Sequence, residues 1–179
     1  NILITIGASE ANYLVAKTML SPGDEVVTLQ PAYLQLPGNA INNGIKIKTV
    51  ELVEEKNWAL DLEQLNKAVN AKTKIISVIN PNNPTGHILD ETEMQAIIES
   101  ASAVGAWIVA DEVYAGTERG DRQVTPSFWG KYDRVIAINS MSKAYGMPGL
   151  RIGWVVAPEE IQPELQLRHE YTTISATML

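Results

Sequence analysis

Short apolar runs rich in β-branched residues alternate with amphipathic, helix-like segments along the whole 179-residue chain. This alternation is typical of α/β folds, in which helices cover both faces of a mostly parallel sheet. We expect seven strands, at residues 2–6, 25–29, 45–52, 74–79, 106–110, 135–139 and 151–157. The link between the last two is too short for a crossover helix, so the last strand should run antiparallel to its neighbours. The sequence thus predicts a three-layer α/β/α fold with seven strands, one of them antiparallel.

Composition restricts the architecture and the partners. The chain has 179 residues, of which 45% are hydrophobic, which is enough for one core but short for two full domains. We therefore expect one globular unit, residues 1–179. The net charge of −7 and the scattered basic residues argue against nucleic-acid binding. The chain has no cysteine, and His87 and His169 lack metal-ligand spacing, so we expect no metal site. No apolar run is long enough for a signal peptide or a membrane span, so we expect a cytoplasmic protein without membrane contact.

Residues 140–154 carry the clearest chemistry in the chain. They follow the expected strand 135–139, so their hydroxyl groups and Lys143 should lie at its carboxyl end, where α/β sheets bind ligands. Serines and an arginine among glycines offer hydrogen-bond donors and positive charge to a phosphate group. The amine of Lys143 remains beside them, and such an amine can form a Schiff base with an aldehyde. Taken alone, however, a lysine is more often a solvated surface residue.

Four other strand ends carry small or polar residues. Residues 7–9 open a helix whose amides can approach an anion, unless Ser9 is an ordinary N-cap. Residues 80–86 form an extended, amide-rich excursion or a simple tight loop. Asp111 ends a buried strand, where a carboxylate needs a positive partner unless it caps a turn. Tyr33 follows the second strand, where a tyrosine commonly packs with its hydroxyl in water.

Together these segments resemble the fold-type I pyridoxal-phosphate enzymes, specifically the class I/II aminotransferases. The family pattern Ser-x-Ser-Lys-x-x-Gly-x-x-Gly-x-Arg matches residues 140–151, and Asn-Pro-x-Asn-Pro-Thr-Gly matches residues 80–86. The resemblance spans nearly the whole chain. It implies pyridoxal 5′-phosphate as cofactor and transfer of an amino group between an amino acid and a 2-oxo acid. Two alternatives stay open: a pyridoxal-dependent carbon–sulfur lyase, and a non-catalytic module that binds the cofactor.

The resemblance also implies a role for each residue of the motifs. Lys143 would hold the cofactor as a Schiff base and then move the substrate's Cα proton. Asp111 would pair with the pyridine nitrogen, and Tyr33 would stack on the ring. Tyr114 and Asn83 would hydrogen-bond the phenolic oxygen from opposite sides. The phosphate ligands would be Gly7, Ala8, Ser9, Ser140, Ser142 and Arg151.

The same resemblance implies parts that this chain lacks. The family has an N-terminal arm and a small C-terminal domain with an arginine for the substrate carboxylate. We therefore expect a piece of a longer protein, in which cofactor binding is weakened and transamination is slow or absent. We expect a homodimer for the full-length enzyme. The connection at residues 116–132, with Phe128 and Trp129 as anchors, is long enough for a functional loop, but its sequence indicates no role. The sequence does not identify the amino donor either.

Overall fold

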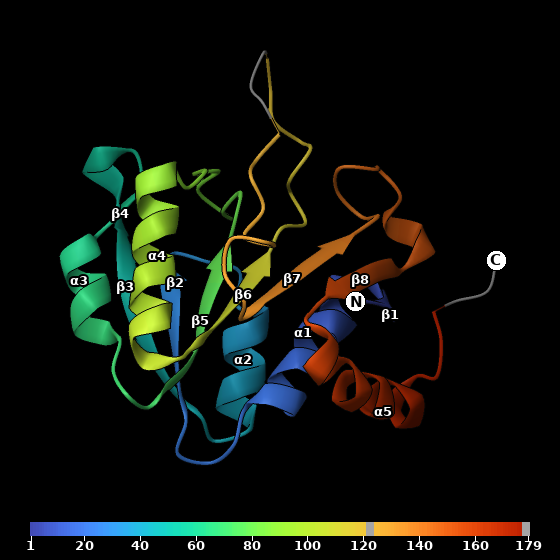
Figure 1. Cartoon of the computed structure of the whole chain (residues 1–179). Helices are drawn as coiled ribbons and strands as arrows, with labels where there is room; N and C mark the ends of the chain where they lie inside the picture. The colour runs from blue at the N-terminus through green and yellow to red at the C-terminus, as the bar shows by residue number, and fades with distance from the viewer. Residues whose placement is uncertain (121–123, 177–179) are drawn as a thin grey trace.

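The computed structural model describes residues 1–120 and 124–176, which form one sheet with helices on both faces (Figure 1). The strands are β1 (Ile2–Ile6), β2 (Glu25–Gln30), β3 (Lys46–Val53), β4 (Ala59–Leu60), β5 (Thr73–Ile79), β6 (Trp107–Asp111), β7 (Val135–Ser140) and β8 (Ile152–Val156). The α-helices are α1 (Gly7–Met19), α2 (Gln35–Asn42), α3 (Leu62–Ala68), α4 (Glu91–Val104) and α5 (Gln162–Thr172). Short 3-10 helices lie at Glu54–Lys56, Pro148–Leu150 and Glu159–Ile161.

The strand order is β1-β8-β7-β6-β5-β2-β3-β4. The five strands from β7 to β3 are parallel, and β8 runs antiparallel to β7 and β1, which confirms the predicted fold class and last strand. The sheet has eight strands rather than the predicted seven, because β4 pairs antiparallel with β3. At two residues, β4 is too short to show a periodic pattern. β1 points the same way as β7, so the carboxyl ends of six strands lie along one edge.

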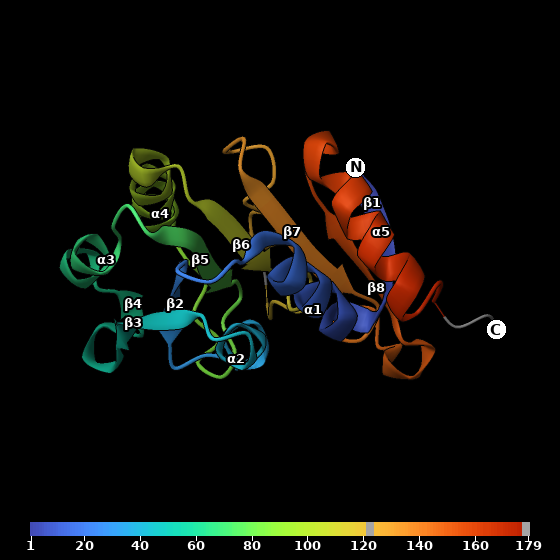
Figure 2. The ribbon, with the colours of Figure 1, turned by 90° about the horizontal axis from the view of Figure 1, so that it is seen from below.

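Successive residues of the central strands enter two different cores, because side chains alternate across a strand. Val26 and Ile75 lie in a core with buried residues of α1, α2 and α5. Their neighbours Val27 and Ile76 lie in a second core with residues of α3 and α4. Figure 2 shows α3 and α4 on one side of the sheet and α1 and α2 on the other. The helices thus cover the faces and leave the carboxyl edge to loops.

The start of α4 follows from its local sequence, in which Asp90 and Glu93 are three residues apart. Asp90 Oδ1 accepts a hydrogen bond from the backbone N–H of Glu93, and Glu93 Oε2 accepts one from the N–H of Asp90. This capping box satisfies two amide groups at the helix start. Gly105 ends the helix with φ at 68°, a left-handed conformation that costs glycine little.

The start of α1 is different, because no side chain caps it in the manner of a serine. The alternative interpretation of Ser9 as an N-cap is therefore wrong. Glu10 instead reaches back, and its Oε2 accepts a hydrogen bond of 2.5 Å from the N–H of Ile6. Its Oε1 accepts a hydrogen bond from Thr173 and lies 3.2 Å from Nδ1 of the buried His169. The first helix is therefore joined to the last one beside residues 7–9.

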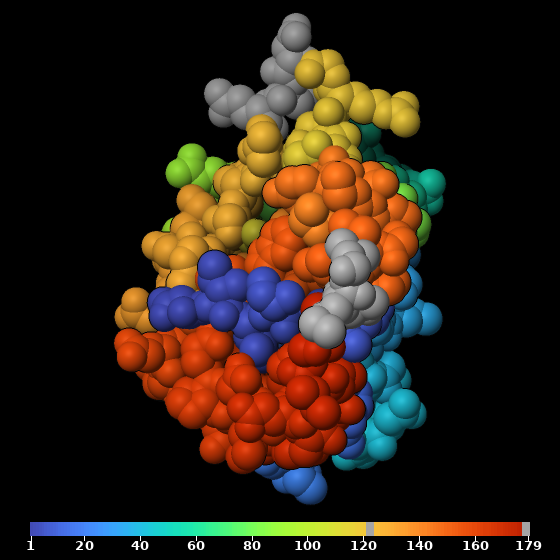
Figure 3. Space-filling model, turned by 90° about the vertical axis from the view of Figure 1, so that its right-hand side faces the viewer, coloured from blue at the N-terminus to red at the C-terminus, as the bar shows by residue number. Residues whose placement is uncertain are grey.

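Strand β8 lies unusually close to the turn between β1 and α1. A Cβ atom at Gly153 would lie 2.4 Å from the carbonyl carbon of Gly7 and 2.6 Å from the amide nitrogen of Ala8, so only glycine fits there. Figure 3 shows the N-terminal residues in blue between the orange of the β8 region and the red of α5. Segments from both ends of the chain therefore meet at this corner of the sheet.

Candidate functional site

Segments at the carboxyl ends of five strands meet at one cavity of about 240 Å³. Every predicted site residue except Gly7 lines it: Ala8, Ser9, Tyr33, Asn83, Asp111, Tyr114, Ser140, Ser142, Lys143 and Arg151. Gln35, Val113 and Pro148 complete the lining. The residues chosen from separate motifs thus lie together around one space.

One corner of this cavity is suited to an anion. It lies at the start of α1, where Ala8 and Ser9 present the first amide groups of the helix, and such groups favour negative charge. A Cβ atom at Gly7 would lie 2.6 Å from Arg151 Nη2, so the absence of a side chain there makes room for the guanidinium. Gly7 also has φ at +67°. Gly7 therefore belongs to this corner although it does not line the cavity.

Ser140 and Ser142, from the segment that carries Lys143, lie at the same corner of the cavity. Ser140 is the last residue of β7 and is buried, whereas Ser142 is half-buried on the turn that follows. The N–H of Ser142 donates to Ser140 Oγ at 3.3 Å, which fixes the turn. Arg151 Nη1 donates to the carbonyl of Pro148 at 2.9 Å, which holds the guanidinium beside that turn.

Asp111 is a buried carboxylate at the end of β6, with 8% of its surface exposed. Its Oδ1 accepts a hydrogen bond of 3.2 Å from the N–H of Val113, so it does cap a turn. Its Oδ2 accepts one of 3.2 Å from Asn12 Nδ2. Burial raises the pKa of Asp111, and the hydrogen bonds from Asn12 and Val113 offset part of that rise. No cation pairs with it within the described ranges, so this carboxylate favours a positively charged group in the cavity.

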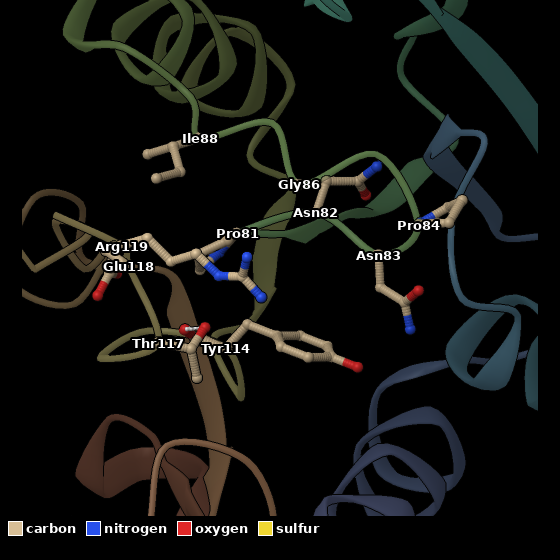
Figure 4. Close-up of a pocket in the computed structure, with 10 residues that line it drawn as sticks. All are labelled: Pro81, Asn82, Asn83, Pro84, Gly86, Ile88, Tyr114, Thr117, Glu118 and Arg119. Atoms are coloured by element: carbon tan, nitrogen blue, oxygen red, sulfur yellow. Dashed lines mark hydrogen bonds between the residues drawn. The ribbon is translucent and has the colours of Figure 1, made fainter. Parts of the chain in front are cut away.

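The loop at residues 80–86 is held by two of its three asparagines. Asn80 Oδ1 accepts a hydrogen bond from the N–H of Leu89, and Asn82 Nδ2 donates to the carbonyl of Pro31 at 3.0 Å. The second contact joins this loop to the one that carries Tyr33. The third asparagine, Asn83, is left to face the cavity, and Figure 4 shows its amide and the ring of Tyr114 pointing toward one another.

Lys143 is exposed at the mouth of the cavity. Its Nζ lies 5.3 Å from the centroid of the Tyr114 ring, within the range of a cation–π contact. Tyr33 lines the same cavity with about half of its surface, 52%, exposed. The amine, the phenol and the second aromatic ring therefore border the same space.

The connection after β6 is anchored by Glu112, for which the sequence had suggested no role. Glu112 Oε1 accepts hydrogen bonds from Ser127 Oγ at 2.9 Å and from the N–H of Phe128 at 3.0 Å. Burial raises the pKa of Glu112, and these two hydrogen bonds offset part of the rise. Phe128 is fully buried, as expected of an anchor, whereas Trp129 is exposed, so the expectation for Trp129 is wrong.

Asn12 is the most important residue that the sequence interpretation missed. It is buried in α1, and its amide donates both to Asp111 and to the carbonyl of Ala8 at 3.0 Å. Its only signal is a polar residue among the apolar residues of a buried helix, which does not point to a partner 99 positions away.

No metal-binding group of three or more His, Asp or Glu occurs in residues 1–120 and 124–176. In the same ranges no helix has the length and apolar character needed to cross a membrane.

Comparison with known proteins adds a family to this geometry. The family described as aminotransferase class I and II matches residues 1–178. A probable aspartate aminotransferase of Methanocaldococcus jannaschii is 34% identical over 183 residues, or 99% of this chain and 48% of the relative. Capreomycidine synthase of Streptomyces vinaceus is 36% identical, over 99% of this chain and 46% of the relative. The crystal structure of a PLP-dependent aminotransferase from Streptococcus suis 89-1591 has a TM-score of 0.90 and 41% identity, over 98% of this chain and 46% of that one. The chain thus spans about half the length of the curated relatives it matches.

Proposed function

This chain belongs to the aminotransferase class I and II family, and on that premise we propose that it is the cofactor-binding domain of an enzyme that transfers an amino group between an amino acid and a 2-oxo acid. The family depends on pyridoxal 5′-phosphate. One observation carries the proposal. A single cavity brings together an amine at Lys143, a buried carboxylate at Asp111 and an anion-binding corner at Arg151.

The residues of the cavity fit this cofactor at three points. The corner formed by α1 and Arg151 offers amide groups and a guanidinium to a phosphate. Asp111 offers a buried negative charge that suits a protonated ring nitrogen. The side chains of Asn83 and Tyr114 offer hydrogen-bond donors to a phenolic oxygen. Phosphate, ring nitrogen and phenolic oxygen are the polar groups that the cofactor presents besides its aldehyde.

When bound, pyridoxal phosphate supplies an aldehyde and a ring that withdraws electrons from the substrate's α-carbon. Asp111 would keep the proton on the ring nitrogen, and its burial would make that charge interaction stronger than it would be in water. Lys143 would hold the cofactor through its amine and, as a free amine, would take the proton from the substrate's α-carbon and deliver it to the cofactor. Tyr33, which lines the same cavity, would pack against the ring and orient it.

We further propose that residues 1–179 are one domain of a cytoplasmic homodimer whose N-terminal arm and small C-terminal domain lie outside this chain. The family resemblance supports this, as does the match to about half of each relative. Light scattering of the whole protein tests the dimer, and cell fractionation tests the location.

The test is to add pyridoxal phosphate to the purified chain, record its visible absorbance and reduce with borohydride. Peptide mass analysis then locates the pyridoxyl group. We expect one modified site, Lys143, and loss of the label in Lys143→Ala. Lys131→Ala is the matched control, because Lys131 is also exposed but lines a different cavity. Labelling spread over many lysines, or absent from Lys143 in the folded protein, would contradict the proposed cofactor site.

A further inference from the structure

Glu10 is a buried carboxylate that the proposed chemistry does not use. It lies in the first turn of α1, with 9% of its surface exposed. Some of its partners come from the far end of the chain, because α5 packs beside α1 (Figure 2). A carboxylate is costly to bury unless its oxygens accept hydrogen bonds, so the partners of Glu10 indicate which segments it holds in place.

One oxygen of Glu10 holds the turn between β1 and α1. Oε2 accepts a hydrogen bond of 2.5 Å from the N–H of Ile6, the last residue of β1. The hydroxyl of Thr5 donates to the carbonyl of Gly7 at 2.9 Å, so a second side chain fixes the same turn. The first amide groups of α1 follow directly and have no acceptor within the helix, so they are available to an anion.

The other oxygen of Glu10 joins this turn to the end of α5. Oε1 accepts a hydrogen bond from the hydroxyl of Thr173 and lies 3.2 Å from Nδ1 of His169. The next residue, Ile174, has φ at +70°, a left-handed conformation that a β-branched residue rarely adopts. Such a conformation persists where surrounding contacts enforce it. The contact with Glu10 therefore holds the end of α5 against the preference of its own backbone.

The turn has little room to move, because Arg151 lies against it. A Cβ atom at Gly7 would lie 2.6 Å from Arg151 Nη2. A small shift of the turn would therefore change where the amide groups of Ala8 and Ser9 lie relative to the guanidinium. All of these groups belong to the corner proposed for the phosphate, so the contacts of Glu10 bear directly on that corner.

We propose that Glu10 is a positioning residue for the phosphate of the cofactor and that His169 and Thr173 hold it, so that docking of α5 and phosphate binding support each other. This role rests on the proposed function and adds the last helix to the cofactor site. It is not electrostatic, since a negative charge near the corner by itself opposes an anion. Glu10 favours the phosphate through the backbone geometry that its two oxygens impose.

Absorbance titrations with pyridoxal phosphate and with pyridoxal, which lacks the phosphate, test this role. We expect Glu10→Ala to weaken binding of pyridoxal phosphate about three- to tenfold, the range for one buried hydrogen bond, although it removes a negative charge. Pyridoxal does not use the corner and should bind Glu10→Ala as it binds wild type. Glu10→Gln should keep most of the affinity, because its amide oxygen can still accept from the N–H of Ile6.

Thr173→Val removes the hydroxyl that donates to Glu10 and keeps the size of the side chain. It should lower the affinity for pyridoxal phosphate, and not for pyridoxal, as Glu10→Ala does. Thr172→Val is the matched control, because the hydroxyl of Thr172 donates to the carbonyls of Arg168 and His169 inside α5. Equal losses for the two ligands, or equal losses in Thr173→Val and Thr172→Val, would overturn the assignment.

Hydrogen exchange of the chain without cofactor gives a second readout, with inorganic phosphate as the probe. Because coupling between two sites is reciprocal, phosphate should slow exchange in α5 more than in α3, which packs on the other face of the sheet. This difference should disappear in Thr173→Val. Equal slowing in the two helices, or none, would contradict the role of Glu10. A chain that shows the difference but takes no label on Lys143 would count against the proposed function alone.

Discussion

Nδ2 of Asn12 lies 3.2 Å from Oδ2 of Asp111, across 99 positions of the chain, and the same amide donates to the carbonyl of Ala8. One buried side chain thus connects the start of α1 with the carboxylate at the end of β6. These are the places proposed for the phosphate and for the ring nitrogen of the cofactor. Asn12 therefore helps to fix the distance between these two places, although it does not line the cofactor cavity itself.

Replacing Asn12 with alanine should weaken cofactor binding about three- to tenfold, the usual cost of one buried hydrogen bond. The pKa of Asp111 should rise further, because the hydrogen bond from Asn12 lowers it. Absorbance titrations with pyridoxal phosphate at several pH values measure both effects. Asn66→Ala, at an exposed position of α3, is the control. If Asn12→Ala kept the wild-type pH dependence, Asn12 would not act through Asp111.

Because the pKa of Asp111 is raised, we expect pH to act in opposite directions on cofactor affinity and on the stability of the chain without cofactor. Its folded pKa is raised above the ordinary value, so the folded state binds this proton more tightly than the unfolded state does. As pH falls from neutral through the raised pKa, its titration should favour folding but remove the negative charge that the ring nitrogen needs. Affinity for pyridoxal phosphate should therefore fall with pH in this window. Asp111→Asn should bind at least about tenfold more weakly at neutral pH and lack this dependence. An Asp111→Asn variant with the wild-type profile would exclude Asp111 as the titrating group.

Gly153→Ala tests the close approach of β8 to the β1–α1 turn. The new methyl group would lie 2.4 Å from the carbonyl carbon of Gly7, so one backbone segment must move. We expect a loss of about 1–3 kcal/mol in the free energy of unfolding, as for other overpacked sites, together with weaker cofactor binding. Gly149→Ala is the matched control, because a Cβ atom there meets nothing within 4 Å. Urea unfolding of the two variants should separate them clearly, and equal stabilities would mean that the turn adjusts freely.

Glu25 should contribute to stability in acid. Hydrogen bonds from Asn70, Lys48 and Lys46 hold its pKa at about 2, against 4.5 for an ordinary glutamate. Its folded pKa is lowered, so its contribution is complete above about pH 4.5 and disappears as pH falls toward 2. Between those values, wild type should lose stability more steeply than Glu25→Gln. Thermal unfolding at a series of pH values checks this, with the exposed Glu63→Gln as control; parallel curves would show that Glu25 has no such role.

Motifs at strand ends, read together with the family resemblance, predicted residues that the structure brings together at one cavity. The reason is topological, since parallel strands deliver their carboxyl ends to one edge, and the residue after each strand arrives there whatever its distance in sequence. The antiparallel direction of β8 was predictable for a similar reason, because a short link leaves no room for a crossover. A local signal also accounts for the start of α4, where Asp90 and Glu93 interact within one helical turn.

Contacts between distant segments were not predictable in this way. Asn12 and Glu112 act through partners that no local pattern specifies, and Ser9 lies at a helix start without capping it. β4 pairs with β3 through two residues, below the length at which alternation is informative. Glu118 holds the loop after β6 by accepting hydrogen bonds from Gly116 and Thr125, and no local pattern predicts these contacts.

The pairing of β1 with β8 has a consequence for how the protein is made. β1 holds residues 2–6 and its partner holds residues 152–156, so β1 leaves the ribosome long before the strand with which it pairs. The turn carrying Gly7 cannot take its final position until Gly153 lies against it. A growing polypeptide therefore has no complete place for a phosphate until this late stretch has emerged. Cofactor capture should follow synthesis of β8 rather than accompany the making of the earlier strands.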